Sequence, residues 1–196
     1  MRRFLALVCA LLLPVAAFAD TGTVQPGFVQ PFASHEMVAA ANPLAAEAGL
    51  EMLKAGGSAV DAAIAVQMVL NLVEPESSGI GGGAFMLAFD PKTKTTTSFD
   101  GREGAPASAT PGMFLGPDGQ ARPKSEVIPG GLSVGVPGVI AMLEMAHGKY
   151  GRLPWARLFA PAIKLAQDGF PVGPKLARTI ARWPQMGEMP DIHRTF

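Results

Sequence analysis

The fold of this chain is decided by residues 58–101, which read SAVDAAIAVQMVLNLVEPESSGIGGGAFMLAFDPKTKTTTSFDG. Ser58 followed by Asp61 is typical of a capping box and predicts a helix start, and Glu74-Pro75 ends that helix. Nearly every residue between them is apolar, so the helix must be buried on most sides. After a glycine-rich stretch, Ala84–Phe89 and Thr95–Phe99 flank a turn and predict an antiparallel β-hairpin.

Further elements are predicted on both sides of this stretch. Upstream, residues 37–41 have the length and composition of a short strand, and Asn42-Pro43 begins a helix that ends at Gly56-Gly57. Downstream, the many Gly and Pro residues of 103–131 predict a loop. It is followed by a short strand at 132–136 and by helices over 137–147, 154–167 and 174–183. Helices, then a hairpin, then more helices indicate an α+β fold with more than two layers.

The composition excludes several classes of protein. The chain has 196 residues, 48% of them hydrophobic, with 16 Lys and Arg against 16 Asp and Glu. An apolar fraction of this size is not that of a disordered chain, and the neutral balance gives no basic surface for nucleic acid. The single cysteine, Cys9, excludes a disulfide scaffold and a cysteine-based metal cluster.

Residues 1–19 have the pattern of a signal peptide. Arg2-Arg3 precede an apolar run from Phe4 to Val15, and Ala17-Phe18-Ala19 form a small-x-small cleavage site before Asp20. The apolar run is too short to span a bilayer comfortably. We therefore expect a periplasmic or secreted protein with no membrane attachment after cleavage, in which residues 20–34 form a lead-in arm.

A glycine motif at Gly79–Ala84 matches G-x-G-x-x-A, the dinucleotide-binding fingerprint, and Asp100 lies near the distance expected for a ribose carboxylate. That fingerprint must follow a strand and open a helix, so that the helix N-terminus meets the pyrophosphate. Here it follows a predicted helix and opens a predicted strand. We interpret the glycines as a site of close backbone packing.

A second motif, Gly131–Gly135, matches the G-x-S-x-G nucleophile elbow, with Asp168 and His193 downstream in the order that serine hydrolases use. A hydrolase with Ser133 as nucleophile is therefore an alternative hypothesis. Pro129-Gly130 interrupts the strand that should lead into the elbow, which weighs against it.

The three histidines and two neighbouring glutamates are further candidates for a functional site. The three histidines His35, His147 and His193 are scattered without metal-ligand spacing. We interpret each of them as a surface histidine or a packed histidine. Glu74 and Glu76 flank a proline, and we interpret them as a solvated helix end.

Arg102 follows the hairpin and stands between Asp100 and Glu103. These two carboxylates can hold its side chain in a fixed orientation. The planar guanidinium fork of an arginine suits bidentate capture of a carboxylate.

Several ordered blocks resemble the gamma-glutamyltransferases (gamma-glutamyltranspeptidases). These blocks are Gly56–Ala63 (GGSAVDAA), Gly81–Leu87 (GGGAFML), Asp100–Pro106 (DGREGAP), Val136–Gly138 (VPG) and Ala162–Phe170 (AIKLAQDGF). The resemblance implies a four-layer αββα N-terminal-nucleophile hydrolase made as one precursor, which cleaves itself into a large and a small subunit. It also implies that the new N-terminal threonine of the small subunit attacks the γ-glutamyl carbonyl of glutathione or a related compound.

The resemblance gives Arg102 a role, as the residue that binds the α-carboxylate of the γ-glutamyl group. Many members of the family have larger residues where Gly101 and Gly104 stand, and we interpret the difference at Gly101 as variation within a subgroup. No cofactor and no metal are expected. The partners implied are a small γ-glutamyl substrate and the small subunit of the same precursor.

The chain departs from the family in what it lacks. It has no threonine in the T-x-H context that marks the nucleophile, since Thr195 follows His193. Residues 35–196 are therefore expected to be the N-terminal portion of the large subunit, with no catalytic residue of their own and no activity alone. The alternative from another class is a periplasmic module that binds carboxylates through Arg102 without catalysis.

Overall fold

The structure is a computed structural model that describes residues 32–128 and 130–182. Phe32 and Ala33 belong to a separate N-terminal unit, and every helix and strand of the described residues lies in the unit that begins at Ser34. The elements of that unit, in chain order, are α1 (Pro43–Lys54), α2 (Ala59–Val73), β1 (Ala84–Asp90), β2 (Thr95–Gly101), α3 (Lys124–Val127), the 3₁₀ turn η1 (Gly131–Ser133), α4 (Val139–Tyr150), the 3₁₀ segment η2 (Trp155–Phe159), α5 (Ala160–Asp168) and α6 (Pro174–Arg182).

The first helix begins and ends where the sequence predicts. The Asn42 side chain accepts a hydrogen bond from the Leu44 N–H at 3.0 Å, and Pro43 occupies the first helical position. After Lys54 the chain reverses through Gly56, whose φ of +87° suits glycine. The reversal brings α2 back against α1.

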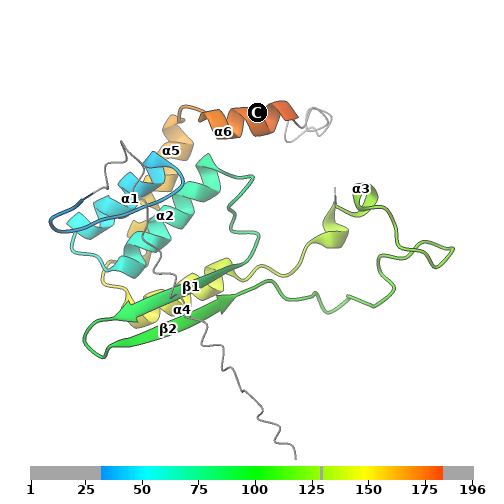
Figure 1. Cartoon of the computed structure of the whole chain (residues 1–196), viewed down its shortest axis with the longest axis horizontal. Helices are drawn as coiled ribbons and strands as arrows, with labels where there is room; N and C mark the ends of the chain where they lie inside the picture. Colours follow the sequence, from blue (N-terminus) through cyan, green and yellow to red (C-terminus); the bar gives the residue numbers. More distant parts are fainter. Residues whose placement is uncertain (1–31, 129, 183–196) are drawn as a thin grey trace, which may run out of the picture. The chain divides into compact units, whose positions relative to one another are not determined.

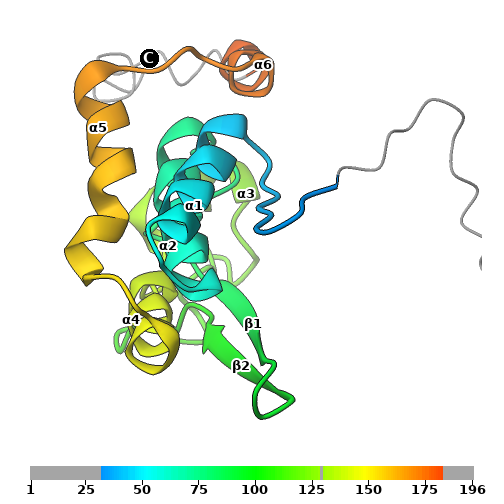
Figure 2. The ribbon, with the colours of Figure 1, turned by 90° about the vertical axis from the view of Figure 1, so that its left-hand side faces the viewer.

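Helix α2 is the centre of the fold. Its predicted capping box is present, because Ser58 Oγ accepts from the Asp61 N–H at 3.1 Å and Asp61 Oδ2 accepts from the Ser58 N–H at 2.7 Å. The helix packs against α1, α4, η2 and α5, as Figure 2 shows for α1 and α5. Residues on most of its circumference are buried, which confirms the prediction from its apolar sequence.

The predicted hairpin is present, with β1 and β2 antiparallel and Phe85 opposite Asp100. One face packs on the core, where Phe99 meets Tyr150 of α4 edge-on at 6.2 Å between ring centroids. Figure 1 shows α4 running along the hairpin, and contacts join α4 to β2. The other face exposes three large apolar side chains of β1: Phe85, Leu87 and Phe89.

One hydrophobic core joins these elements. Met52 of α1, Ile64 of α2, Leu143 of α4 and Leu158 of η2 are at most 2% exposed. Burying a side chain of this size stabilises a fold by about 1.5–3 kcal/mol. Helices that are far apart in the sequence are thus held by the same cluster.

Two predicted strands are wrong. Residues 37–40 are irregular and residue 41 lies in a bend, so the strand expected at 37–41 is absent. The strand expected at 132–136 is replaced by η1 and one isolated bridge between Val136 and Gly104. A strand needs a continuous ladder, and Pro137 has no N–H with which to extend this one. The loop predicted over 103–131 is confirmed for its described residues apart from α3, single bridges and Gly131, which begins η1.

The later helices are present with altered bounds. The helix predicted over 137–147 begins at Val139 and continues to Tyr150. The one predicted over 154–167 is divided into η2 and α5, because Pro161 has no N–H to donate to the Arg157 carbonyl four residues earlier. The last predicted helix matches α6 to Arg182, and its expected end at Trp183 lies outside the described residues.

Candidate functional site

The candidate site lies at the end of β2, where Arg102 leaves the hairpin. The Asp100 carboxylate accepts a hydrogen bond from the Arg102 backbone N–H at 2.8 Å. It therefore forms the turn that ends the strand. The Arg102 side chain is 74% exposed, and its Nε lies 3.6 Å from Oε2 of Glu103. Within residues 32–128 and 130–182 its terminal guanidinium nitrogens make no hydrogen bond, so this fork is free to bind an acceptor.

The neighbouring carboxylate, Glu103, is held in a cradle of glycines. A Cβ atom built on Gly83 would lie 2.3 Å from Glu103 Oε2, and one on Gly135 would lie 2.9 Å from Glu103 Cβ. Oε2 is buried and makes no hydrogen bond to the described residues. The absence of side chains at Gly83 and Gly135 is what lets this carboxylate lie beside Arg102.

The glycine stretch before β1 serves packing, as predicted. Asn71 Oδ1 of α2 accepts from the Ile80 N–H at 2.9 Å. The Gly82 carbonyl accepts from the N–H groups of Gly138 and Val139, at 3.1 and 3.3 Å, at the start of α4. The stretch follows a helix and opens a strand, which is the wrong context for a dinucleotide.

The serine-elbow hypothesis is wrong. Ser133 is exposed in the 3₁₀ turn η1, and the described residues before it form no strand. An elbow needs a strained turn from a strand into a helix, which presents the hydroxyl to a histidine. Asp168 forms an ion pair with Lys164 on the surface of α5. His193 lies outside the described residues, as does the signal-peptide segment with Cys9.

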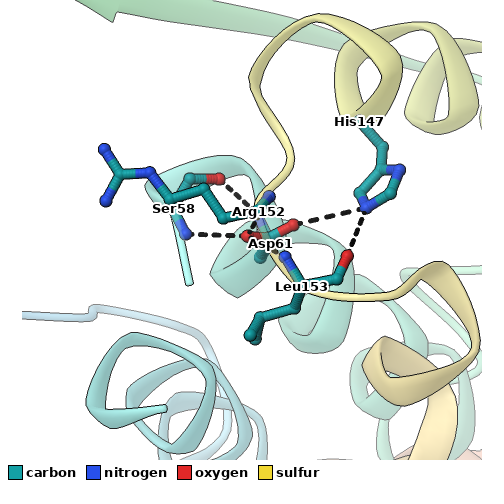
Figure 3. Close-up of polar contacts among 5 residues, drawn as sticks. All are labelled: Ser58, Asp61, His147, Arg152 and Leu153. Carbon is teal, nitrogen blue, oxygen red and sulfur yellow. Dashed lines mark hydrogen bonds and ion pairs between the residues drawn. The ribbon is translucent and has the colours of Figure 1, made fainter. Parts of the chain in front are cut away.

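A polar cluster that the sequence reasoning missed lies around Asp61, which is fully buried. We call its five residues, Ser58, Asp61, His147, Arg152 and Leu153, the Asp61 cluster (Figure 3). Asp61 Oδ2 accepts from the backbone N–H groups of Ser58, Arg152 and Leu153, at 2.7, 2.9 and 3.3 Å. In the sequence, Asp61 was recognisable only as part of a local capping box. Its contacts with Arg152 and Leu153 span about 90 residues, and no sequence pattern indicates them.

His147 completes the Asp61 cluster. Its Nε2 donates to the Leu153 carbonyl at 2.8 Å, so that nitrogen carries the proton. Asp61 Oδ1, which makes no hydrogen bond within the described residues, lies 3.6 Å from the same Nε2. The ring also packs edge-on against Trp155 at 5.3 Å between centroids. His147 is thus a packed histidine, one of the two interpretations made from the sequence, and His35 is exposed.

The interpretation of Glu74 and Glu76 as a solvated helix end is wrong for Glu74. Glu74 is only 5% exposed and accepts from Lys175 Nζ at 2.5 Å. Lys175 also lies 3.5 Å from Glu76 and donates to Ser77 Oγ at 3.0 Å. Its hydrogen bond to Glu74 raises the pKa of Lys175 above the usual range. The contact ties the start of α6 to the end of α2, a pairing 101 residues apart that the sequence could not indicate.

Two further properties of the described part of the chain bear on its function. It contains no group of three or more His, Cys, Asp or Glu residues placed to hold a metal ion. None of its helices has both the length and the hydropathy needed to cross a bilayer.

Comparison with known proteins explains this arrangement. The sequence model described as Gamma-glutamyltranspeptidase matches residues 45–196. The chain belongs to the gamma-glutamyltranspeptidase family. It is similar to the "Glutathione hydrolase proenzyme" of Bacillus subtilis (strain 168), with 53% identity over 145 residues that cover 74% of this chain and 25% of that protein. It is also similar to the protein of the same name from Escherichia coli (strain K12), with 41% identity over 169 residues that cover 86% of this chain and 29% of that protein.

The likeness extends to solved gamma-glutamyltranspeptidase structures. The crystal structure of the Helicobacter pylori enzyme matches with a TM-score of 0.76 and 34% identity, over 83% of this chain and 47% of that one. The fold class predicted from the sequence is confirmed: mixed α and β structure forming part of an N-terminal-nucleophile hydrolase fold. The chain spans about a quarter of the length of the curated gamma-glutamyltranspeptidase relatives named here.

Proposed function

We propose that this chain is the N-terminal part of a gamma-glutamyltranspeptidase precursor, and that Arg102 binds the α-carboxylate of its γ-glutamyl donor. The observation that carries the proposal is the geometry of Arg102 itself. Its fork is exposed at the end of β2, with one long ion-pair contact among the described residues, inside the region that the family model matches. Relatives named glutathione hydrolase proenzymes support glutathione and related γ-glutamyl compounds as the substrate class.

The chemistry is acyl transfer. As the family resemblance implies, the nucleophile is the N-terminal threonine that self-cleavage creates in the small subunit, with its own α-amine as base. An acyl-enzyme forms, and water or an amino acid then accepts the γ-glutamyl group. In this scheme Arg102 holds the donor's α-carboxylate by two parallel N–H bonds. It thereby orients the γ-carbonyl toward a nucleophile outside this chain, and residues 35–196 alone are inactive.

The test is Arg102→Lys in the full-length precursor, with a chromogenic γ-glutamyl anilide as donor. Lysine keeps the charge but loses the planar fork. Each charge-assisted bond is worth about 1.5–3 kcal/mol, so kcat/KM should fall roughly ten- to a hundredfold, mainly through KM. Self-cleavage, followed on a gel, involves no substrate carboxylate and should persist.

Arg122→Lys is the matched control. Its Nε also lies 3.6 Å from a glutamate Oε2, that of Glu126, but Arg122 lies in the loop before α3. Unchanged donor kinetics in Arg102→Lys would refute the assignment. If the protein binds γ-glutamyl compounds but never releases the anilide, the carboxylate-binding module is the better description.

We also propose export, with residues 1–19 removed. The support is the arrangement of Arg2-Arg3, the apolar run and Ala17-Phe18-Ala19. Intact mass of the secreted product should place the mature N-terminus at Asp20. A protein retained in the cytoplasm would refute export, and another N-terminus would refute this cleavage site.

A further inference from the structure

The segment 135–138 runs beside the segment that carries Arg102. The Val136 N–H donates to the Gly104 carbonyl at 2.8 Å, and the Gly104 N–H donates to the Val136 carbonyl at 3.2 Å. At the other end of the pair, Gly138 lies against Gly101. Arg102 and Glu103 are therefore held between two backbone contacts with the same neighbouring segment.

The contact at Gly138 leaves no room for a side chain. A Cβ atom built there would lie 2.4 Å from the Gly101 carbonyl oxygen and 2.9 Å from the Arg102 carbonyl oxygen. Both are backbone atoms at the end of β2, so neither can move away as a side chain would. The position of Gly138 thus fixes how closely the backbone of Arg102 approaches α4.

Gly138 is itself anchored. Its N–H and that of Val139 donate to the Gly82 carbonyl, at the end of the glycine stretch that leads into β1. Gly138 therefore contacts the residues at one end of the hairpin: Gly82 just before β1, and Gly101 at the end of β2. The hairpin and α4 meet at this point through backbone atoms.

The Arg102 side chain, in contrast, has little to orient it. It is 74% exposed, and its ion-pair contact with Glu103 is 3.6 Å long. Its direction must come from its backbone. We propose that Gly138 is a positioning residue for Arg102: it sets the backbone of the carboxylate-binding arginine and thereby the enzyme's preference for donors that carry an α-carboxylate. This inference rests on the proposed function of Arg102.

The experiment compares two donors in the full-length precursor. One is a γ-glutamyl anilide, and the other is the 4-aminobutanoyl anilide, which lacks only the α-carboxylate. The measured quantity is the ratio of their kcat/KM values. Loss of folded enzyme lowers both values equally and leaves the ratio unchanged, whereas a displaced Arg102 lowers only the first.

Gly138→Ala should lower this ratio at least tenfold, since misplacement of about 1 Å at a positioning group can cost a hundredfold in rate. Gly148→Ala is the matched control, because Gly148 lies in α4, the helix that Gly138 precedes, with open space around its Cβ position. Its ratio should stay at the wild-type value. In an Arg102→Gln background, Gly138→Ala should cause no further fall in the ratio, because it acts through Arg102.

The outcomes separate the two proposals. If Arg102→Gln alone leaves the ratio unchanged, the proposed function of Arg102 is wrong. If Arg102→Gln lowers the ratio but Gly138→Ala does not, the inference on Gly138 is overturned. Should Gly138→Ala give no soluble, cleaved enzyme, Gly135→Ala replaces it, because its Cβ would lie 2.9 Å from Glu103 Cβ and 3.1 Å from the Gly104 carbonyl oxygen. A ratio equal to that of wild type in Gly135→Ala would then overturn the inference.

Discussion

Replacing Asp61 by asparagine tests how much the buried carboxylate of the Asp61 cluster stabilises the fold. The side chain keeps its shape and one acceptor oxygen, but the acceptor is now neutral. Bonds to a charged acceptor are roughly twice as strong as neutral ones. The two shorter bonds, from Ser58 at 2.7 Å and Arg152 at 2.9 Å, should each lose about 1 kcal/mol. We expect the free energy of unfolding to fall by about 2 kcal/mol.

Asp61→Ala should cost more, about 4 kcal/mol, because it leaves N–H donors unpaired beside a buried cavity. The assay is urea unfolding followed by tryptophan fluorescence, to which Trp155 contributes, since its ring packs against His147 of the same cluster. Asp118→Asn is the control: Asp118 accepts one backbone hydrogen bond, from Gln120 at 3.0 Å, in an exposed loop. Its change should stay within about 0.5 kcal/mol. If Asp61→Asn and Asp118→Asn unfold at the same urea concentration, the charge of Asp61 contributes nothing and the reasoning fails.

Three further predictions concern packing, solubility and pH. Leu87→Thr should reduce self-association of the isolated chain in size-exclusion chromatography, because Leu87 is 74% exposed on the outer face of the hairpin; an unchanged elution profile would point to another surface. Gly57→Ala should cost about 1–3 kcal/mol in urea unfolding, since its Cβ would lie 2.7 Å from a backbone oxygen of α1, whereas Gly148→Ala should cost nothing; equal midpoints would contradict this. The hydrogen bond to Glu74 raises the pKa of Lys175, so its stabilisation is complete at neutral pH and is lost as pH rises through that raised value. Above about pH 10.4 the free energy of unfolding should therefore fall less steeply with pH in Lys175→Gln than in wild type. An identical slope in the two proteins would refute the role of the Lys175–Glu74 hydrogen bond.

Local signals in the sequence predicted the elements that depend on neighbouring residues. Asn42-Pro43 and the Ser58–Asp61 box predicted two helix starts, and the turn after Asp90 predicted the antiparallel hairpin. The strand expected at 132–136 is absent because strand formation depends on a partner, and among the described residues the only pairing there is the bridge to Gly104. β-favouring residues alone cannot show whether a partner strand is available.

The sequence predicted which residue forms the candidate site, but not the distant residues that hold it in place. Arg102 was identifiable because its motif is contiguous, and its neighbours Asp100 and Glu103 are next to it in the chain. Its contacts with Gly138 are not local, so no sequence pattern connects Arg102 with Gly138. The same holds for Glu74, whose burial depends on Lys175, 101 residues later.

The hydrogen bond between Asp61 and the Arg152 backbone also has a consequence for synthesis. The two residues are 91 positions apart, so at about 5–20 residues per second a ribosome makes Arg152 roughly 5–20 s after Asp61. Helices α1 and α2 are adjacent and can pair early, since their contacts are local. Until Arg152 is made, the Asp61 carboxylate of the nascent α1–α2 pair therefore stays hydrated. Ribosome-bound chains stalled before and after Arg152 emerges should differ sharply in how well a protease cuts α2.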